Sequence, residues 1–359
     1  MELVYSMADL RIFRLTPASD QQGWQPFVLN SRQANPFSAP VWLRAISEAC
    51  CCEVDILVVA RGEEWLGGIH VFWNNRFGKM AGLFPPQTPY GTVIYSPSLS
   101  TAVYPSKITS NHLEISRVLA EALKHRYSSV THKHLPSIED IRAWQWSGWN
   151  IIPNYTYIVD LTSSCRPSSS FKKHYAKCEK SECQLSFSWD LKLFWSTVES
   201  MLRRQATQIG FSKETFFVLA ETLHTSGMAW MATALNKEGL PLASRIELSL
   251  DGTETVFDWV AGSSSDHLSS GVNSWLLMKL RDECQRRGYK HWNLCGANVE
   301  SVAAFKSGIG GQLTHAFTVS SPRSIPESIY QSLRSSAAQV KWKVVSEMKM
   351  RRKNVSSDR

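Results

Sequence analysis

Hydrophobic and polar residues alternate over many short segments of this chain, and longer stretches with helical periodicity lie between them. Alternation is typical of a half-buried strand, whereas apolar residues at three- and four-residue intervals indicate a helix. In the first half, residues 54–60 and 65–73 predict the two strands of a hairpin. Residues 40–48 and 112–127 predict helices with one apolar face.

The second half has a similar mixture of elements, but its sequence does not repeat that of the first. Residues 228–235, 241–250 and 254–262 are apolar segments joined by the short turns NKEG and DG. This pattern predicts an antiparallel meander. The other elements predicted here are a strand over 154–161, helices over 190–208, 213–225 and 271–288, a strand over 291–297, a short helix over 301–308, a strand over 312–319 and a long helix over 325–350.

The chain has 359 residues, which is long for one ordinary domain and suits two. A hydrophobic content of 43% is enough for well-buried cores. We therefore predict an α/β (α+β) protein with mixed sheets flanked by helices, divided into domains 1–150 and 151–322 and a C-terminal helix with a basic tail, 323–359. No G-x-G-x-x-G motif follows a first strand, so a dinucleotide-binding fold is disfavoured.

The formal net charge is +8, and part of the excess lies in residues 341–353, which hold six basic residues and one acid. A basic excess favours phosphate-bearing partners such as nucleic acid or an anionic membrane surface, although a solvated tail has the same composition. The chain lacks the aromatic and basic interleaving of a known nucleic-acid module, which disfavours that class. Helical spacing in the tail predicts buried positions at Ile329, Leu333, Val340 and Val344.

The spacing of the cysteines and the length of the apolar runs bear on metal binding and on the cellular compartment of the protein. None of the eight cysteines forms a C-x-x-C pair, so no zinc or other metal site is predicted. Three adjacent cysteines, at 50–52, suit a reducing compartment. The first 15 residues carry charges within their apolar stretch, and no run approaches 18 apolar residues. We therefore expect a cytoplasmic protein without a transmembrane segment.

Two segments of the second half, residues 201–216 and 257–313, resemble the Fem-type, peptidoglycan aminoacyltransferase-like branch of the GNAT acyltransferase superfamily. The resemblance extends more diffusely over residues 40–313. It implies tandem GNAT-like domains, with the C-terminal helix packed on the first. It also implies a bacterial transferase that acts on an amine or hydroxyl of a cell-envelope or polysaccharide precursor, either a small molecule or lipid-linked.

The resemblance further implies a donor, acyl-CoA or aminoacyl-tRNA, and tRNA or an anionic membrane would be a partner for the basic tail. The Q/R-x-x-G-x-G/A pattern of CoA-binding relatives is missing, which leaves the choice of donor open. The alternative is a non-catalytic binding protein that keeps the fold and has lost the donor site.

Lys306 matches the Phe-Lys position of the resembling family, which implies a catalytic role. A cation near the donor carbonyl stabilises the oxyanion that develops during acyl transfer. We expect Lys306 to point into a cleft of the second domain. The alternative is a helix C-terminal lysine that complements the helix dipole. Phe305 beside it suits either donor contact or packing.

A serine-rich segment before the helix at 271–288 is the expected donor-binding loop. Ser269, Ser270 and Gly271 would offer backbone N–H groups to donor phosphates at a helix N-terminus, with Asn273 beside them. An ordinary serine cap explains the same residues.

The acceptor is expected at Tyr90, in the segment PPQTPYG at the rim of the first domain, and at Arg204. A guanidinium suits a phosphate-bearing acceptor, but a solvated helix face or a rigid proline turn would account for these residues as well. Asp258 and Glu247 are candidates for a general base and also for sheet-face ion pairs.

Overall fold

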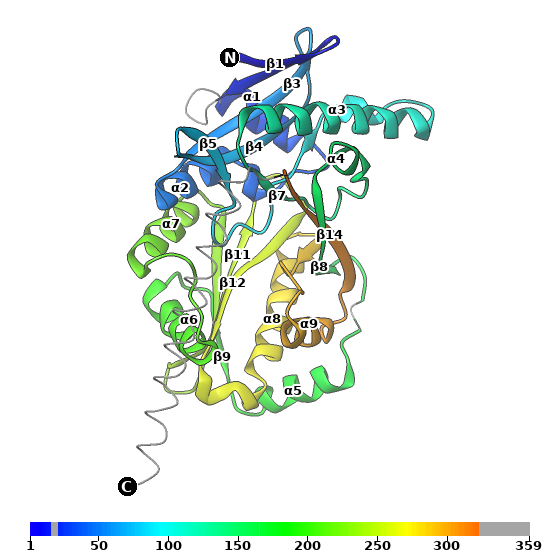
Figure 1. The fold of residues 1–359 in the computed structure, drawn as a ribbon. Helices are drawn as coiled ribbons and strands as arrows, with labels where there is room; N and C mark the ends of the chain where they lie inside the picture. Colours follow the sequence, from blue (N-terminus) through cyan, green and yellow to red (C-terminus); the bar gives the residue numbers. More distant parts are fainter. Residues whose placement is uncertain (16–20, 165, 323–359) are drawn as a thin grey trace.

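The structure of the chain, a computed structural model, describes residues 1–15, 21–164 and 166–322 (Figure 1). It contains two sheets flanked by helices, which confirms the predicted fold class. The predicted helix over 325–350 and its four buried positions lie outside the described residues. No helix in the described ranges combines the length and apolar character needed to cross a membrane.

The first sheet has the strand order β1-β2-β3-β4-β5, and β6 pairs with β4. The predicted hairpin forms its centre as β3 and β4. Helix α3 covers one face of the sheet, and α1 and α2 cover the other, so β3 is buried along its whole interior. The elements up to residue 133 are β1 Glu2–Met7, β2 Leu10–Leu15, α1 Gln21–Leu29, η1 Pro36–Ser38, α2 Pro40–Cys50, β3 Glu53–Arg61, β4 Glu64–Arg76, β5 Lys79–Leu83, β6 Ile94–Tyr95, η2 Pro97–Ser100, α3 Pro105–Arg126 and β7 Thr131–Lys133.

The second sheet has the order β7-β14-β8-β13-β12-β11-β10-β9. The predicted meander is β10, β11 and β12. β7 comes from the first half of the chain and pairs with β14, so the sheet takes strands from both sides of the domain boundary predicted at residue 150. The remaining elements are α4 Arg142–Trp146, β8 Asn150–Asp160, α5 Ser169–Glu179, β9 Gln184–Ser186, α6 Leu191–Gln205, α7 Lys213–Thr225, β10 Ala229–Leu235, β11 Pro241–Ser249, β12 Thr255–Ser263, η3 Ser265–Ser270, α8 Val272–Arg286, β13 His291–Asn293, α9 Glu300–Ser307 and β14 Gln312–Ser320.

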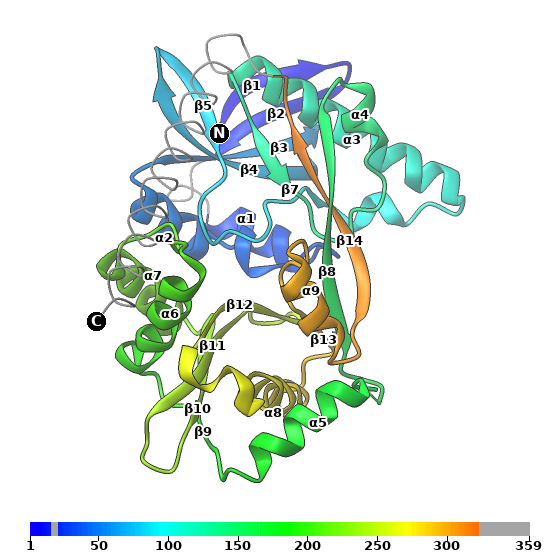
Figure 2. The same cartoon turned by 60° about the horizontal axis from the view of Figure 1, so that its bottom comes forward.

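Helices cover both faces of the meander. Figure 2 shows α6 and α7 on one side of β10–β12 and α8 with α5 on the other. Alternate residues of β10 supply the two faces: Met231 packs with α6 and α7, and Trp230 and Ala232 pack with α8. β10 is therefore apolar on both faces, as its sequence indicates.

β12 and β13 are parallel neighbours that separate along their length. Their pairing extends only from Thr255 with His291 to Phe257 with Asn293, whereas β12 continues to Ser263. β13 is shorter than the predicted strand over 291–297. The chain turns away because Cys295 and Gly296 have φ values of 49° and 94°. This separation leaves an opening between β12 and the segment that leads to α9.

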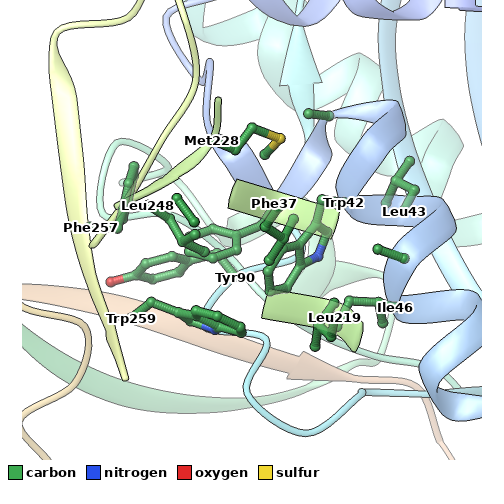
Figure 3. Close-up of a cluster of buried hydrophobic side chains, with 14 of the residues drawn as sticks. Phe37, Trp42, Leu43, Ile46, Tyr90, Leu219, Met228, Leu248, Phe257 and Trp259 are labelled. Atoms are coloured by element: carbon green, nitrogen blue, oxygen red, sulfur yellow. The ribbon is translucent and has the colours of Figure 1, made fainter. Parts of the chain in front are cut away.

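One apolar cluster joins the two halves of the chain (Figure 3). Phe37 packs edge-on against Phe257 with ring centroids 5.2 Å apart, and Trp42 packs against Trp259 at 5.7 Å. The indole N–H of Trp259 donates to the carbonyl of Gln87 at 2.7 Å. Aromatic contacts of this kind stabilise beyond the area that they bury. The first half is therefore held firmly against the back of β12, the strand that bounds the opening.

Candidate functional site

A pocket of about 470 Å³ lies where β12 and β13 separate. Its walls come from α6, the meander, η3, the start of α8 and α9. Three cationic side chains and one carboxylate line it, which favours an anionic or electron-rich ligand. The lining residues are Met201, Arg204, Gln205, Arg245, Asp258, Trp259, Ala261, Gly262, Ser263, Leu268, Asn273, Cys295, Ser301, Val302, Phe305 and Lys306.

A buried ion pair lies at this pocket. The guanidinium of Arg245 donates to Oδ2 of Asp258 at 2.5 Å, and each residue is only 5% exposed. Oδ1 of Asp258 and Nε of Arg245 have no hydrogen-bond partner among the described residues. Buried polar atoms without partners are rare in folded proteins. The two atoms are therefore candidates for contacts with a ligand.

Glu247 faces Asp258 directly across the β11–β12 pair. It is fully buried, and its Oε2 accepts a hydrogen bond from the indole of Trp292 at 2.8 Å. Burial, together with the charge of Asp258, raises the pKa of Glu247 well above its ordinary value. The two carboxyl groups therefore differ: burial favours the neutral form of Glu247, whereas Asp258 has a cationic partner.

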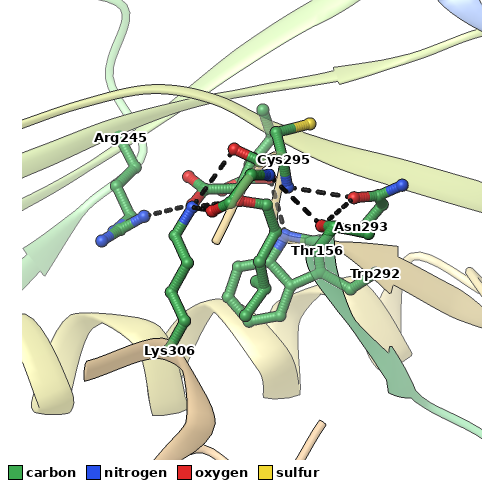
Figure 4. Close-up of polar contacts among 10 residues, drawn as sticks. Thr156, Arg245, Trp292, Asn293, Cys295 and Lys306 are labelled. Carbon is green, nitrogen blue, oxygen red and sulfur yellow. Dashed lines mark hydrogen bonds and ion pairs between the residues drawn. The ribbon is translucent and has the colours of Figure 1, made fainter. Parts of the chain in front are cut away.

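Lys306 is buried and lines the pocket, as the sequence predicts. Its ammonium donates to the carbonyls of Leu294, Cys295 and Gly296, the last two at 3.4 and 3.1 Å (Figure 4). An ammonium has three N–H donors, so these carbonyls use all of them. The contacts lie in the turn after β13 and not at the end of α9, which disfavours the helix-dipole alternative. Burial lowers the pKa of Lys306.

Thr156 of β8 and the side chain of Asn293 also hydrogen-bond to the turn after β13. Oδ1 of Asn293 accepts from the hydroxyl of Thr156 at 2.8 Å and from the backbone N–H of Cys295 at 3.0 Å. The N–H of Gly296 donates to the Thr156 hydroxyl at 3.3 Å. The turn is therefore fixed by β8, by Asn293 and by Lys306 together (Figure 4).

The expected donor-binding residues separate into two groups. Asn273 and Phe305 line the pocket, whereas Ser269, Ser270 and Gly271 do not. Within the protein, the carbonyl of Ser269 accepts from Lys177 at 2.6 Å. The hydroxyl of Ser270 donates to a carbonyl of its own turn and accepts from the first N–H of α8.

Gly271 has a structural requirement that explains it without a ligand. Its φ is +86°, and a Cβ at this position would lie 2.1 Å from the carbonyl oxygen of His174 in α5. We expect Gly271→Ala to lower the free energy of unfolding by about 2–4 kcal/mol, since a left-handed conformation and a backbone clash combine.

Gly288→Ala is the matched control for this variant, because Gly288 has φ +87° with nothing within 4 Å. It should cost only about 1–2 kcal/mol in urea unfolding. Equal losses in the two variants would show that α5 does not press on Gly271.

The two expected acceptor residues lie in different environments. Arg204 is exposed at the pocket, and its described partners are the hydroxyls of Ser265 and Ser263 at 3.4 and 3.5 Å. The sequence predicts Tyr90 at the rim of the first domain, and this prediction is wrong. The residue is 0% exposed. Its hydroxyl bonds with the side chain of Asn293, and its ring packs in the cluster between the two halves. The reason is that the second half covers the PPQTPYG segment.

The sequence analysis did not single out Arg245. It named Asp258 as a candidate general base but equally as a sheet-face ion-pair partner. A signal was present, because both are charged residues inside otherwise apolar strands of the meander. Such residues are rarely buried unless they are paired. Among the described residues, no group of three or more His, Cys, Asp or Glu side chains is arranged to hold a metal ion.

The fold is similar to several solved structures. FemX matches with a TM-score of 0.63 and 10% identity, covering 89% of this chain and 99% of FemX. The C-terminal domain of a putative lysylphosphatidylglycerol synthetase from Agrobacterium fabrum matches with a TM-score of 0.54 and 10% identity over 89% of this chain and 96% of that one. A tandem GNAT protein from the clavulanic acid biosynthesis pathway gives 0.52 and 12% over 87% and 98%. No protein family and no curated protein sequence matches.

Proposed function

The chain has the Fem-type, tandem GNAT-like fold, and from that premise we propose that it is an acyl- or aminoacyl-transferase. The acceptor would be an amine or hydroxyl of a cell-envelope or polysaccharide precursor. The reaction would take place in the pocket between β12 and the turn after β13. The observation that carries this proposal is the buried Arg245–Asp258 pair at that pocket, in which one carboxylate oxygen has no hydrogen-bond partner among the described residues.

The free oxygen of Asp258 fits the role of a general base. An amine that attacks a carbonyl carbon must lose a proton, and a carboxylate within hydrogen-bond reach can accept it. In this step the amine nitrogen bonds to the donor carbonyl, the bond to the donor's carrier breaks, and the proton passes through Asp258 to the leaving thiol or hydroxyl. Arg245 fixes the orientation of the carboxylate through its bond to Oδ2.

Lys306 would stabilise the oxyanion that develops on the donor carbonyl during transfer. Its contact with the carbonyl of Cys295, at 3.4 Å, is long for a hydrogen bond, so that N–H is the one most easily redirected toward a ligand. A donor aimed at the oxyanion lowers the barrier by several kcal/mol when water is excluded. Phe305, on the same helix as Lys306, and Asn273, at the start of α8, also line the pocket.

Arg204 suits a phosphate on the acceptor. It is exposed at the pocket, and its described partners are neutral hydroxyls that leave its charge uncompensated. The same argument extends to the donor, acyl-CoA or aminoacyl-tRNA, because both carry phosphates. A small-molecule or lipid-linked precursor fits this arrangement, and tRNA or an anionic membrane surface would contact the basic tail. A cytoplasmic, bacterial setting is part of the proposal.

A transfer assay with each donor tests the proposal. Purified protein is incubated with labelled acetyl-CoA or labelled aminoacyl-tRNA and with a panel of amino sugars and peptidoglycan precursors, and labelled product is measured. We expect one donor to raise the unfolding midpoint by mass action and to give product. Asp258→Asn should keep donor binding and slow transfer by about 10²–10⁴-fold, the range for losing a general base.

A non-catalytic GNAT-fold binding protein is the second candidate. It is favoured by one observation, the use of all three Lys306 donors by backbone carbonyls. In that case a precursor would raise the unfolding midpoint, but neither donor would do so and no labelled product would form. Absence of binding by every donor would contradict the transferase proposal.

A further inference from the structure

Two thiols lie almost in bonding contact at the end of α5. The Sγ atoms of Cys178 and Cys183 are 2.8 Å apart, and both residues are free cysteines. A disulfide needs about 2.0 Å between the sulfurs. A movement of less than 1 Å would therefore bring them to bonding distance.

The chain between these cysteines is already folded into a closed turn. Cys178 is in the last turn of α5, and Cys183 comes directly before β9. The hydroxyl of Ser181 donates to the carbonyl of Cys178 at 2.6 Å, and Glu182 adopts a positive φ of 56°. A left-handed residue in the turn returns the chain toward the helix. Closing the bond would therefore need little reorganisation of the backbone.

We propose that Cys178 and Cys183 form a reversible disulfide, so that this turn is a redox modification site joining α5 to β9. The inference does not depend on the transferase proposal. Its elements are the sulfur separation, the closed turn and the different exposure of the two cysteines: Cys178 is buried, and Cys183 is half-buried.

A peroxide is the class of oxidant that balances the reaction. The more accessible sulfur of Cys183 attacks one oxygen of hydrogen peroxide, the O–O bond breaks and the leaving hydroxide takes a proton as water. The resulting sulfenic acid is then attacked by Cys178, the S–O bond breaks and the second hydroxide leaves as water with the proton of Cys178. Two thiols lose two electrons to the peroxide. Burial raises the pKa of Cys178 to about 12, so Cys178 is the less suited of the two to the first attack on peroxide.

The state of this bond would affect a wall of the pocket. Helix α5 contacts the η3–α8 segment through Lys177, whose ammonium donates to the Ser269 carbonyl, and through Glu179, which accepts from the indole of Trp275. That segment contributes Leu268 and Asn273 to the pocket. A disulfide between the end of α5 and β9 would therefore restrain the helix that packs against Leu268 and Asn273 through the η3–α8 segment.

Peptide mapping tests the bond directly. Lys180 lies between the two cysteines, so trypsin places Cys178 in peptide 178–180 and Cys183 in peptide 181–192. Reduced full-length protein is treated with hydrogen peroxide, remaining thiols are alkylated and the digest is analysed without reductant. We expect these two peptides to appear joined, with a mass about 2 Da below their sum, and to separate after dithiothreitol treatment. Both peptides alkylated while other cysteines are oxidised would overturn the proposal.

Two variants and a second measurement complete the experiment. Cys183→Ser should abolish the joined peptide, and Cys51→Ser, at an exposed cysteine away from this turn, should leave it unchanged. Oxidation should raise the unfolding midpoint of the wild type by about 2–5 °C, because a short closed loop restrains the unfolded chain. It should also slow amide exchange at the end of α5. A joined peptide without any change in this exchange would overturn the claim that α5 is restrained.

Discussion

Lys306→Ala is expected to slow acyl transfer by about 10²–10³-fold, the range for losing one oxyanion donor. The structure adds an effect that the sequence does not suggest, since from the sequence alone folding should stay nearly intact. The three carbonyls of Leu294, Cys295 and Gly296 lose their donor in a buried place. Each unpaired carbonyl carries a desolvation penalty, so we expect the free energy of unfolding to fall by about 2–4 kcal/mol.

The two effects of this substitution can be separated. Turnover is measured well below the unfolding midpoint of the variant, where the folded fraction is the same as in wild type. Lys306→Met preserves the aliphatic stem and removes only the ammonium, so it should lose turnover as strongly as the alanine variant. Lys290→Ala, at an exposed lysine paired with Glu254, should change neither property. Turnover of Lys306→Met within about threefold of wild type would mean that the lysine only holds the turn.

The elements of the second half follow from its sequence because both faces of the meander are covered. A nearly continuous apolar strand such as β10 needs helices on either side, and the amphipathic segments around it supply these. The position of Lys306 at a pocket was predictable for a similar reason. Small residues follow a buried strand, and a short helix then returns the lysine to the end of that strand.

The ion pair of the site was not predictable, because it depends on register. The β11–β12 pairing shifts by one residue between Ile246 and Glu247, at a bulge. A bulge changes which side chains face each other across the strands. Without the register, Arg245, Glu247 and Asp258 are three charges on two strands. With it, they become one ion pair and, facing it, a carboxyl group whose pKa is raised.

Two other expectations differ from the structure because of contacts between residues distant in sequence. The serine-rich segment has the composition of an anion site, but α5 packs on it through the carbonyl of His174. Tyr90 lies among prolines and a glycine, which is typical of an exposed loop. It is buried because β12 of the other half lies against it.

Acidification below pH 6.5 is expected to destabilise the protein steeply, through three buried histidines where the two sheets meet. His70 is on β4, His132 is on β7 and His134 follows it. A ring nitrogen of His70 and one of His132 lie 3.4 Å from the position that a Cβ on Gly91 would take. Burial lowers the pKa of His70 and of His134 to about 3, and burial with its neighbours lowers that of His132 well below its ordinary value.

The direction of this effect follows from proton uptake. The unfolded chain binds a proton at each histidine near pH 6.5, whereas the folded chain keeps all three neutral. Stability is therefore complete above pH 6.5 and falls as the pH drops toward 3, by about 1.4 kcal/mol per pH unit for each histidine. Glu247, whose pKa is raised, takes up a proton on folding above pH 4.5 and so offsets the effect of one of the three histidines. The net slope should be about 3 kcal/mol per pH unit, which removes about 7 kcal/mol between pH 6.5 and pH 4, a large share of a typical stability of about 5–15 kcal/mol.

The variant His134→Leu tests the contribution of one of these histidines to the pH dependence of stability. Neither ring nitrogen of His134 has a hydrogen-bond partner among the described residues, so a leucine of similar volume loses no polar contact. We expect its stability at pH 8 to stay within about 1.5 kcal/mol of wild type. In urea unfolding, the slope of its stability between pH 6.5 and pH 5 should be smaller than that of wild type by about 1.4 kcal/mol per pH unit. His315→Leu, at an exposed histidine of β14, should keep the wild-type slope. An unchanged slope in His134→Leu would mean that this ring takes up its proton without unfolding.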